Sequence, residues 1–409
     1  MFRKAMFAGL LLGAVLVAGQ GAEAAEQPWE WKAGSAAAVV TPKTSMKMAG
    51  YAARKEPAEG TEQELFAKAL ALEDAQGNRV VFITLDLIGV TERLRSLVTQ
   101  QVEAKFKLPP RSLVMNASHT HCGPAYSGDD ATAYFEFLTQ TLTNLVGRAL
   151  GDLQPATLHY SIARCGFAMN RRTPTVMGYR NHPNPDGPVD HSVPVLSVRG
   201  AAGKLRSMMF GYACHNTTMG FRRWLGDYAG YAQEFLERDH PGVTAQFMMG
   251  CGGDQNPYPR SELRYAEQHG RSLATAVEAA LETKQTTLLH QHSLHGPVQS
   301  IFDTVTLDYT DSQRPAIAYP VQLIQFGKEL TIVALSSETV VDYVVATQKR
   351  PANSSRPGHL GGRLLECYGR LHSQSASAIG RRLRGRKSSV AAHIGRAHRG
   401  QGSRALFPH

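Results

Sequence analysis

The sequence lacks the local motifs by which many metal and redox proteins are recognised. None of its 5 cysteines forms a C-x-x-C pair, which argues against a zinc knuckle or a dithiol redox site. No H-E-x-x-H string is present, so the helix-borne motif of zinc proteases is absent as well. After residue 24 no apolar run reaches the roughly 20 residues that a bilayer-spanning helix needs. Any metal site must therefore be assembled from distant parts of the chain.

Acidic residues are almost absent from the end of the chain. Residues 352–409 contain 11 lysines and arginines and a single acid, Glu366. The rest of the chain carries 33 basic and 33 acidic residues, so the formal net charge of +10 belongs to this segment alone. A neutral body argues against a basic nucleic-acid-binding protein. We therefore predict no nucleic-acid partner.

The first residues have the pattern of a secretory signal. Arg3 and Lys4 precede a short apolar run over 7–18, and the A-E-A string at 22–24 offers a cleavage site. The apolar run is too short for a membrane anchor. We therefore predict a cleaved signal peptide over 1–24 and a secreted or periplasmic protein. Export permits disulfides, but the odd number of cysteines leaves their pairing open.

Apolar runs alternate with helical patterns over most of the chain. Residues 79–87 and 113–117 are rich in apolar and β-branched residues, which predicts strands. A helix capped by Thr91 and ended before Pro109 is expected between them, and 131–150 show helical spacing. Further strands are expected at 157–163, 193–198, 208–213, 245–249 and 330–335, and further helices at 231–238 and 261–282. This interleaving predicts an α/β fold with a mixed β-sheet core flanked by helices.

Polar clusters follow directly on several of the predicted strands. Asp86 ends one strand, and His119 and His215 lie just after two others. Glu338 follows the last strand, and Asp254 lies in a glycine-rich stretch after another. In α/β sheets, sites gather at the carboxyl ends of strands. The sequence therefore predicts one convergent site at these strand ends.

Two histidines and one glutamate in these clusters are of the types that bind catalytic zinc. Such an ion takes three protein ligands from His, Glu or Asp and keeps a position for water. We therefore predict that His119, His215 and Glu338 bind Zn²⁺ at the strand carboxyl ends. For each, the alternative is a strand-end residue that is satisfied by backbone groups. His121 lies two residues after His119, which suits it to orient a ligand or transfer a proton.

Several short strings resemble the neutral and alkaline ceramidase family, in the same order along residues 35–345. They are M-A-G-Y at 48–51, A-S-H-T-H-C-G-P at 117–124, A-C-H-N-T-T-M at 213–219 and G-D-Y-A-G-Y at 226–231, with further likeness at 78–87, 187–191 and 253–254. The H-T-H-C-G-P and H-N-T-T-M strings are specific in combination. We therefore assign residues 25–350 to a domain that resembles the N-terminal catalytic domain of that family.

The resemblance implies an exported zinc amidohydrolase that cleaves the N-acyl amide of ceramide-like lipids with a zinc-bound water. In that family one zinc is held by the first His of H-T-H, a later His, a Glu and a Tyr near the C-terminus. The first three positions correspond to His119, His215 and Glu338, and His121 would assist proton transfer. The implied partner is a lipid-like N-acyl amine. A contact with the membrane surface and the oligomeric state are left open.

One string departs from the family. The family reads G-D-V-S-P-N, with a serine implicated in catalysis, whereas residues 253–258 read G-D-Q-N-P-Y and place Asn256 at the serine position. An asparagine amide can donate a hydrogen bond to a developing oxyanion but is not a nucleophile. We therefore expect His121, Asn256 and Asp254 to be catalytic, without a serine acyl-enzyme. Asp254 either orients a ligand or caps a turn. The alternative substrate is a different amide or an ester.

Four further polar residues are candidates for support or for substrate binding. Asp86 either orients one of the zinc-binding histidines or caps its strand. Arg171 and Arg172 either hold a polar head group or form a surface ion pair. Asp190, in a turn flanked by glycine and proline, either contacts substrate or stabilises its loop.

The basic tail over 351–409 has neither strand alternation nor helical periodicity. Its composition would fit a polybasic arm for anionic lipid or nucleic acid, or a disordered solvated tail. Back-translation favours a third interpretation. When the codons of 369–373 and 379–388 are read from their second base, they can encode V-G-Y-I-P and S-E-G-G-Y-E-G-G-S. The family carries similar strings here, the second with its zinc-binding tyrosine. We therefore predict that the tail is frameshifted and disordered. If the tail as given is authentic, the fourth ligand is missing and the chain could be an inactive fragment.

The frameshift makes a prediction about the coding DNA. Resequencing the gene across codons 345–409 should reveal an open frame that encodes the shifted tyrosine and glutamate motif. Codons that cannot encode those strings would refute the frameshift. The chain would then be a truncated catalytic domain, for which we expect little metal binding and no turnover.

Overall fold

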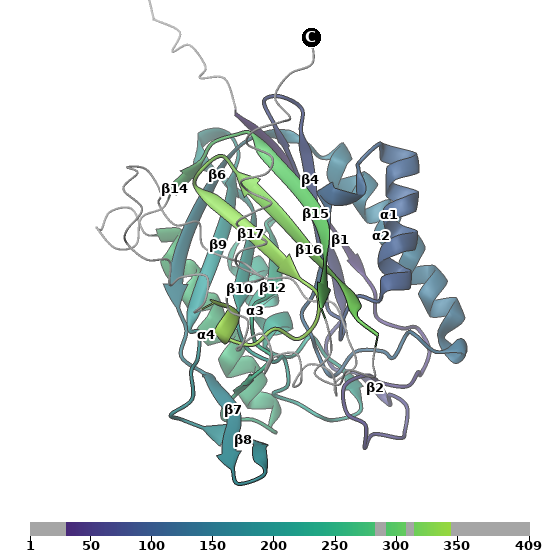
Figure 1. The fold of residues 1–409 in the computed structure, drawn as a ribbon. Coiled ribbons are helices and arrows are strands. Elements are labelled where there is room, and N and C mark those ends of the chain that lie inside the picture. Colours follow the sequence, from purple (N-terminus) through teal and green to yellow (C-terminus); the bar gives the residue numbers. More distant parts are fainter. Residues whose placement is uncertain (1–29, 283–291, 308–314, 345–409) are drawn as a thin grey trace, which may run out of the picture.

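The computed structural model describes residues 30–282, 292–307 and 315–344. The predicted signal peptide over 1–24 and the predicted tail over 351–409 lie outside these ranges. Within them, no helix is both long and apolar enough to cross a membrane. The described residues form a mixed β-sheet with helices on its flanks (Figure 1), which confirms the predicted fold class.

A nine-stranded sheet forms the centre of the molecule. Its strands are β1 (Trp31–Val39), β3 (Phe66–Asp74), β4 (Arg79–Leu85), β5 (Leu113–Ala117), β6 (Gln154–Arg164), β9 (Ser192–Arg199), β10 (Leu205–Tyr212), β12 (Thr244–Met249) and β14 (His292–Leu294). Their order is β12-β10-β9-β6-β1-β3-β4-β5, with β14 also paired to β6. The β4–β5 and β10–β12 pairs are parallel and the others are antiparallel.

Helices and a second sheet cover the two faces of this central sheet. The helices are α1 (Glu92–Phe106), α2 (Thr132–Gly151), α3 (Asp227–Asp239) and α4 (Leu263–Glu282), with short 3-10 turns at Pro110–Ser112, Asp129–Ala131 and Ala201–Gly203. The second sheet is antiparallel and consists of β15 (Val298–Leu307), β16 (Ile317–Phe326) and β17 (Leu330–Leu335). α1 and α2 pack on one face of β3 and β4, and β16 and β17 on the other. β3 and β4 are covered on both faces, and both are therefore apolar along most of their length.

The boundaries of α1 lie where the sequence indicates, whereas the start of α3 does not. The Thr91 side chain accepts a hydrogen bond from Leu94 N at 3.2 Å and caps α1. Lys107 ends that helix in the left-handed conformation, before Pro109. α3 begins earlier than predicted, because Asp227 already lies in its first turn.

The two ends of the sheet path are tied together by one side chain. Asn116 on β5 donates from Nδ2 to the carbonyl of Met249 on β12 at 3.3 Å. Its Oδ1 accepts from Met249 N at 2.9 Å. Lys68 on β3 is buried and donates to the carbonyl of Ala245 on β12 at 2.9 Å. The sheet therefore curls until the carboxyl ends of β5, β10 and β12 are neighbours.

Three strands of the central sheet, β1, β3 and β14, and two groups of outer strands were not predicted from the sequence. One outer group is β7 (Ala168–Thr175) and β8 (Gly178–Asn184), which form a hairpin joined to β13 (Gln255–Pro257); the other is β15 and β16. Proline interrupts β7, β8 and β16, and proline usually argues against a central strand. These strands tolerate it because they belong to small outer sheets. The remaining pair, β2 (Gly60–Thr61) and β11 (Arg223–Trp224), is short.

The cysteines in the described ranges are buried and unpaired, namely Cys122, Cys165, Cys214 and Cys251. Burial raises the pKa of the Cys165 thiol to about 11. These residues therefore behave as small core residues.

The link between β5 and β12 can be tested by substitution. Asn116→Ala should lower the free energy of unfolding by about 2–4 kcal/mol, because it leaves the buried N–H and C=O of Met249 without partners. Urea unfolding followed by circular dichroism measures the change. Asn144→Ala, on the exposed side of α2, is the matched control and should change it by less than about 0.5 kcal/mol. Equal midpoints for both variants would contradict the role of Asn116.

Candidate active site and metal centre

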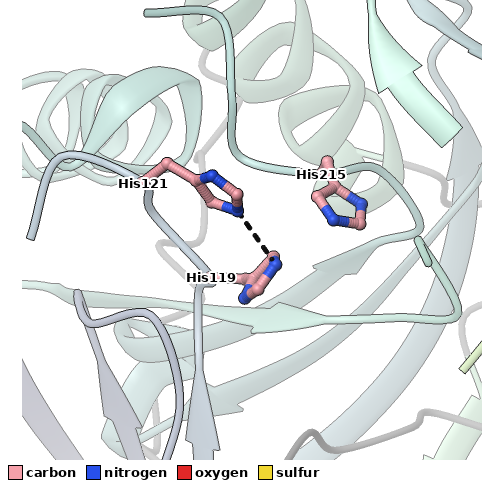
Figure 2. Close-up of side chains that lie close together, drawn as sticks. All are labelled: His119, His121 and His215. Atoms are coloured by element: carbon pink, nitrogen blue, oxygen red, sulfur yellow. Dashed lines mark hydrogen bonds between the residues drawn. The ribbon is translucent and has the colours of Figure 1, made fainter. Parts of the chain in front are cut away.

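Three histidines come together at the carboxyl ends of β5 and β10. His119 and His121 follow β5, and His215 follows β10. One ring nitrogen of each lies within 4.8 Å of the others (Figure 2). The ring centroids of His119 and His215 are 4.7 Å apart. The polar residues after these two strands thus converge, although nearly a hundred residues separate them in the sequence.

Backbone carbonyls orient two of the rings. His119 Nδ1 is 2.6 Å from the carbonyl oxygen of Ile88, and His215 Nδ1 is 2.7 Å from that of Gly252. A carbonyl only accepts, so each Nδ1 carries the proton and each Nε2 presents a lone pair. Metal-binding histidines are commonly held in this way. His119 also has a φ of 62°, in the left-handed region that non-glycine residues seldom occupy.

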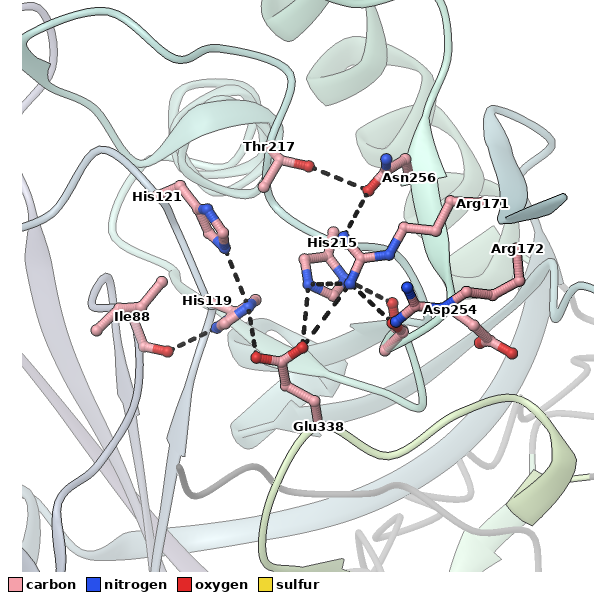
Figure 3. Close-up of polar contacts among 12 residues, drawn as sticks. Ile88, His119, His121, Arg171, Arg172, His215, Thr217, Asp254, Asn256 and Glu338 are labelled. Atoms are coloured by element: carbon pink, nitrogen blue, oxygen red, sulfur yellow. Dashed lines mark hydrogen bonds and ion pairs between the residues drawn. The ribbon is translucent and has the colours of Figure 1, made fainter. Parts of the chain in front are cut away.

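Glu338 lies on the segment after β17 and points at both rings (Figure 3). Its carboxylate oxygens are 3.7 Å from His119 Nε2 and 3.5 Å from His215 Nε2. Two ligands of a tetrahedral zinc, each about 2.0–2.1 Å from the ion, lie about 3.3–3.5 Å apart. The donor atoms of these three residues therefore fit one zinc ion in type and nearly in spacing.

The charge states of these side chains also suit a metal. Burial, followed by the charge of Arg171, lowers the pKa of His215 to about 3, so the ring is neutral at neutral pH. Burial raises the pKa of the Glu338 carboxyl, whereas the charge of Arg171, whose Nη2 is 3.8 Å away, lowers it and favours the ionised form. Neutral imidazole and ionised carboxylate are the forms that ligate.

The guanidinium of Arg171, on β7, lies against the same cluster. Its Nη2 is 2.9 Å from His215 Nε2 and donates to the carbonyl of Gly253 at 2.9 Å. Burial lowers the pKa of Arg171 to about 10, which leaves it charged at neutral pH. Arg171 is therefore a buried part of the site, and the alternative of a surface ion pair is wrong for it. Arg172 is half-buried and donates to the same carbonyl at 3.4 Å.

Asn256, on β13, is held in one orientation beside Arg171. Its Oδ1 accepts from Arg171 Nη1 at 3.2 Å and from Thr217 Oγ1 at 3.4 Å. Because both partners are donors, the carbonyl side of the amide is fixed toward them. Its Nδ2 is buried and has no hydrogen-bond partner among the described residues. The side chain therefore presents an unused donor in the site.

The loop before β13 holds the segment that carries Glu338. Gly253 N donates to the carbonyl of Thr339 at 2.7 Å, and the Asp254 carboxylate accepts from Val341 N at 3.1 Å. A Cβ on Gly253 would lie 2.7 Å from the carbonyl oxygens of both Glu338 and Thr339, so only glycine fits. Asp254 is thus a positioning residue, and burial raises its pKa to about 6.

The sequence matches a known family. Residues 31–257, more than half of the chain, match the family described as neutral/alkaline non-lysosomal ceramidase, N-terminal. The chain belongs to this family. Neutral ceramidase 1 of Arabidopsis thaliana is 24% identical over 262 residues, which is 59% of this chain and 33% of that protein. Neutral ceramidase A of Dictyostelium discoideum is 24% identical over 251 residues, 54% of this chain and 35% of that protein. The chain thus spans about a third of these relatives.

The fold is also that of a ceramidase of known structure. The neutral ceramidase from Pseudomonas aeruginosa superposes with a TM-score of 0.68 at 19% identity, over 86% of this chain and 70% of that one. A ceramidase complexed with C2 superposes with a TM-score of 0.67 at 18% identity, over 83% and 68%. At this level of identity the likeness establishes the fold.

Two predicted residues of this ceramidase-family chain have structural roles outside the histidine cluster. The Asp86 carboxylate accepts from Phe66 N at 3.0 Å and from Gln233 Nε2 at 3.3 Å, so it caps its strand and orients neither His119 nor His215. Asp190 accepts from Ser192 N at 2.9 Å and thereby stabilises its own loop. Both carboxylates thus form hydrogen bonds to nearby backbone groups.

Three neighbours of His121 were not predicted as site residues. The ring of Tyr51 meets the ring of His121 edge-on, with centroids 4.9 Å apart. Arg54 Nη1 donates to the carbonyl of His121 at 2.8 Å. Gly50 has a φ of 101°, and a Cβ on it would lie 2.5 Å from His121 Cγ. The M-A-G-Y string at 48–51 is the sequence signal that could have located Gly50 and Tyr51.

The close approach at Gly253 predicts an effect on metal affinity. If the cluster binds a metal ion, Gly253→Ala should push the Glu338 segment away from the histidines and weaken the affinity for zinc about 10–100-fold, as other losses of ligand support do. Competition against a chromophoric chelator measures this. Gly151→Ala, at the end of α2 with nothing within 4 Å of its added Cβ, is the control and should bind zinc normally. Unchanged affinity in Gly253→Ala would contradict the proposed support.

Proposed function

We propose that this chain is an exported, zinc-dependent amidohydrolase that cleaves the N-acyl amide of ceramide-like lipids. The observation that carries the proposal is the convergence of His119 Nε2, His215 Nε2 and the Glu338 carboxylate at 3.5–3.7 Å. Family membership supports the amide substrate. Export rests on the predicted signal peptide over 1–24, which precedes the described residues.

The same three residues would hold the zinc. When bound, zinc supplies Lewis acidity that polarises a carbonyl and acidifies a water. The tyrosine implied as fourth ligand is encoded only in the shifted frame of 379–388, which lies outside the described residues. Tyr343, near Glu338 in the sequence, packs against the outer sheet of β15, β16 and β17.

His121 is suited to move the proton in this reaction. Its Nε2 lies 3.1 Å from His119 Nε2, at the edge of the proposed metal position. Burial, and then the neighbouring charges of His119 and His215, hold the pKa of His121 well below its usual range. The neutral ring would take a proton from the attacking water and deliver it to the amide nitrogen as the C–N bond breaks. The products would be a fatty acid and an amine.

Asn256 and Arg171 would stabilise the charge that develops on the carbonyl oxygen. Asn256 Nδ2 is a buried donor without a partner, and its amide is fixed by the bond from Arg171. A preorganised donor of this kind stabilises an oxyanion without reorganisation at the moment of reaction. Arg172 is half-buried and donates to the backbone carbonyl of Gly253, and it would bind a polar head group of the substrate.

A second candidate function is hydrolysis of a different amide or an ester at the same site. It is favoured by Asn256 at the position of the family serine, since that change alters a residue that is hydrogen-bonded to Arg171. A third outcome is an inactive chain, if the fourth ligand is indispensable. Metal content and substrate range separate these alternatives.

The test combines metal analysis with turnover. Full-length protein should bind one zinc and hydrolyse a fluorescent N-acyl sphingosine, lose activity with a chelator and regain it with zinc. His119→Ala and Glu338→Gln should lose zinc and at least about 1,000-fold in kcat/KM. His295→Ala, an exposed histidine paired with Glu30, is the control. Zinc binding with turnover only of other amides or esters would favour the second candidate, and absence of both zinc and turnover would refute the proposal.

A further inference from the structure

The β7–β8 hairpin projects from the body of the molecule. β7 and β8 pair antiparallel up to Thr175 and Gly178, so that Val176 and Met177 form the turn. Gly178 has a φ of 124°, a conformation that glycine allows in such a tight connection. In Figure 1 the hairpin extends below the central sheet, with its tip away from every helix. The tip is therefore available to a partner.

The tip is apolar and open to solvent. Val176, Met177 and Tyr179 are 101%, 93% and 55% exposed. They are the three most exposed large apolar side chains in the described part of the chain, and they fall within four consecutive positions. Scattered apolar residues on a surface need no explanation, but a contiguous exposed group marks an interaction site.

The stem of the hairpin is basic and carries no acid. Residues 168–185 contain Arg171, Arg172, Arg180 and His182 but neither aspartate nor glutamate. Arg180 is exposed and forms no ion pair among the described residues. It lies opposite Thr173 on the paired strand and directly follows Tyr179 of the apolar tip. An apolar tip below an unpaired cation matches a lipid surface, where acyl chains lie beneath anionic phosphates.

We propose that the β7–β8 hairpin is a membrane anchor. Val176, Met177 and Tyr179 insert into the interfacial layer of a lipid bilayer, and Arg180 contacts lipid phosphates. The choice of a lipid surface as partner rests on the proposed function, because a lipid substrate resides in a bilayer. Binding itself needs no catalysis, so the two proposals can fail separately.

The anchor is built on the strand that enters the active site. Arg171, five residues before Val176 on β7, has Nη2 2.9 Å from His215 Nε2. β7 is also paired with β13, where Met169 lies opposite Asn256. Five residues of extended strand span about 17 Å. Docking of the tip would therefore fix the height of the active site above the bilayer, and a lipid would have to rise out of its leaflet to reach it.

The first test measures binding of the full-length protein to vesicles. Cosedimentation with phosphatidylcholine vesicles, and with vesicles that also contain phosphatidylglycerol, should give a partition coefficient that falls about tenfold or more in the variant Val176→Ser/Met177→Ser/Tyr179→Ser. Arg180→Ala should weaken only the added binding to phosphatidylglycerol. The control Val39→Ser/Phe137→Ser removes exposed apolar groups elsewhere and should bind as the native chain does. Thermal unfolding verifies that all variants fold.

A second readout reports insertion at the tip itself. Met177→Trp should show a blue shift of its emission on phosphatidylcholine vesicles, measured as the difference from the native protein, and Val39→Trp should not. This signal distinguishes the hairpin from any binding by the basic 351–409 segment. Unshifted emission, or equal partition of the triple variant and the native chain, would overturn the proposal. A native dimer that becomes monomeric in the triple variant, without vesicle binding, would overturn it in favour of a second copy as partner.

Turnover separates this proposal from the proposed function. The triple variant should hydrolyse a soluble short-acyl ceramide analogue at the native rate and lose activity on ceramide embedded in vesicles. Equal activity of the variant and the native chain on vesicles would count against the anchor. Native protein that binds vesicles through the tip but hydrolyses neither substrate would refute the function and leave the anchor standing.

Discussion

A single buried amide joins the two ends of the central sheet. The Asn116 side chain donates one hydrogen bond to the backbone of Met249 and accepts another from it. These two bonds join β5 to β12, which are not paired as strands. His119 lies three residues after Asn116, and His215 follows the neighbouring β10. If the ends of the sheet were apart, the two histidines would lie on opposite edges. The position of the candidate metal site therefore follows from how the sheet closes.

The site consists of polar side chains buried in the protein interior, and neighbouring groups supply hydrogen-bond and charge partners for them. Buried rings and charges are costly unless each polar atom has a partner. Here the outer nitrogens of His119 and His215 are bonded by backbone carbonyls, and the Arg171 guanidinium offsets the charge of Glu338. The atoms left unpaired include Asn256 Nδ2, which faces no partner. Such an exception is what a substrate or ion would be expected to satisfy.

The sequence could predict the elements whose residues repeat with a simple period. Residues 79–87 and the helix after Thr91 have such periods, and both are found where expected. His119, His215 and Glu338 could be grouped because each follows an apolar strand. The β7–β8 hairpin could not be predicted, since its prolines and arginines contradict strand propensity and only its pairing with β13 explains it. Likewise, the partners of the His119 ring are backbone atoms, which no side-chain pattern reveals.

The left-handed backbone of His119 also has a thermodynamic consequence. A non-glycine residue in this region raises the energy of the folded state by about 1–2 kcal/mol. The surrounding fold must therefore be stable enough to hold one of its own side chains in an unfavourable conformation. Selection for stability alone would replace that histidine with glycine or asparagine, so its presence records a compromise in which folding free energy is sacrificed to keep an imidazole at the strand end.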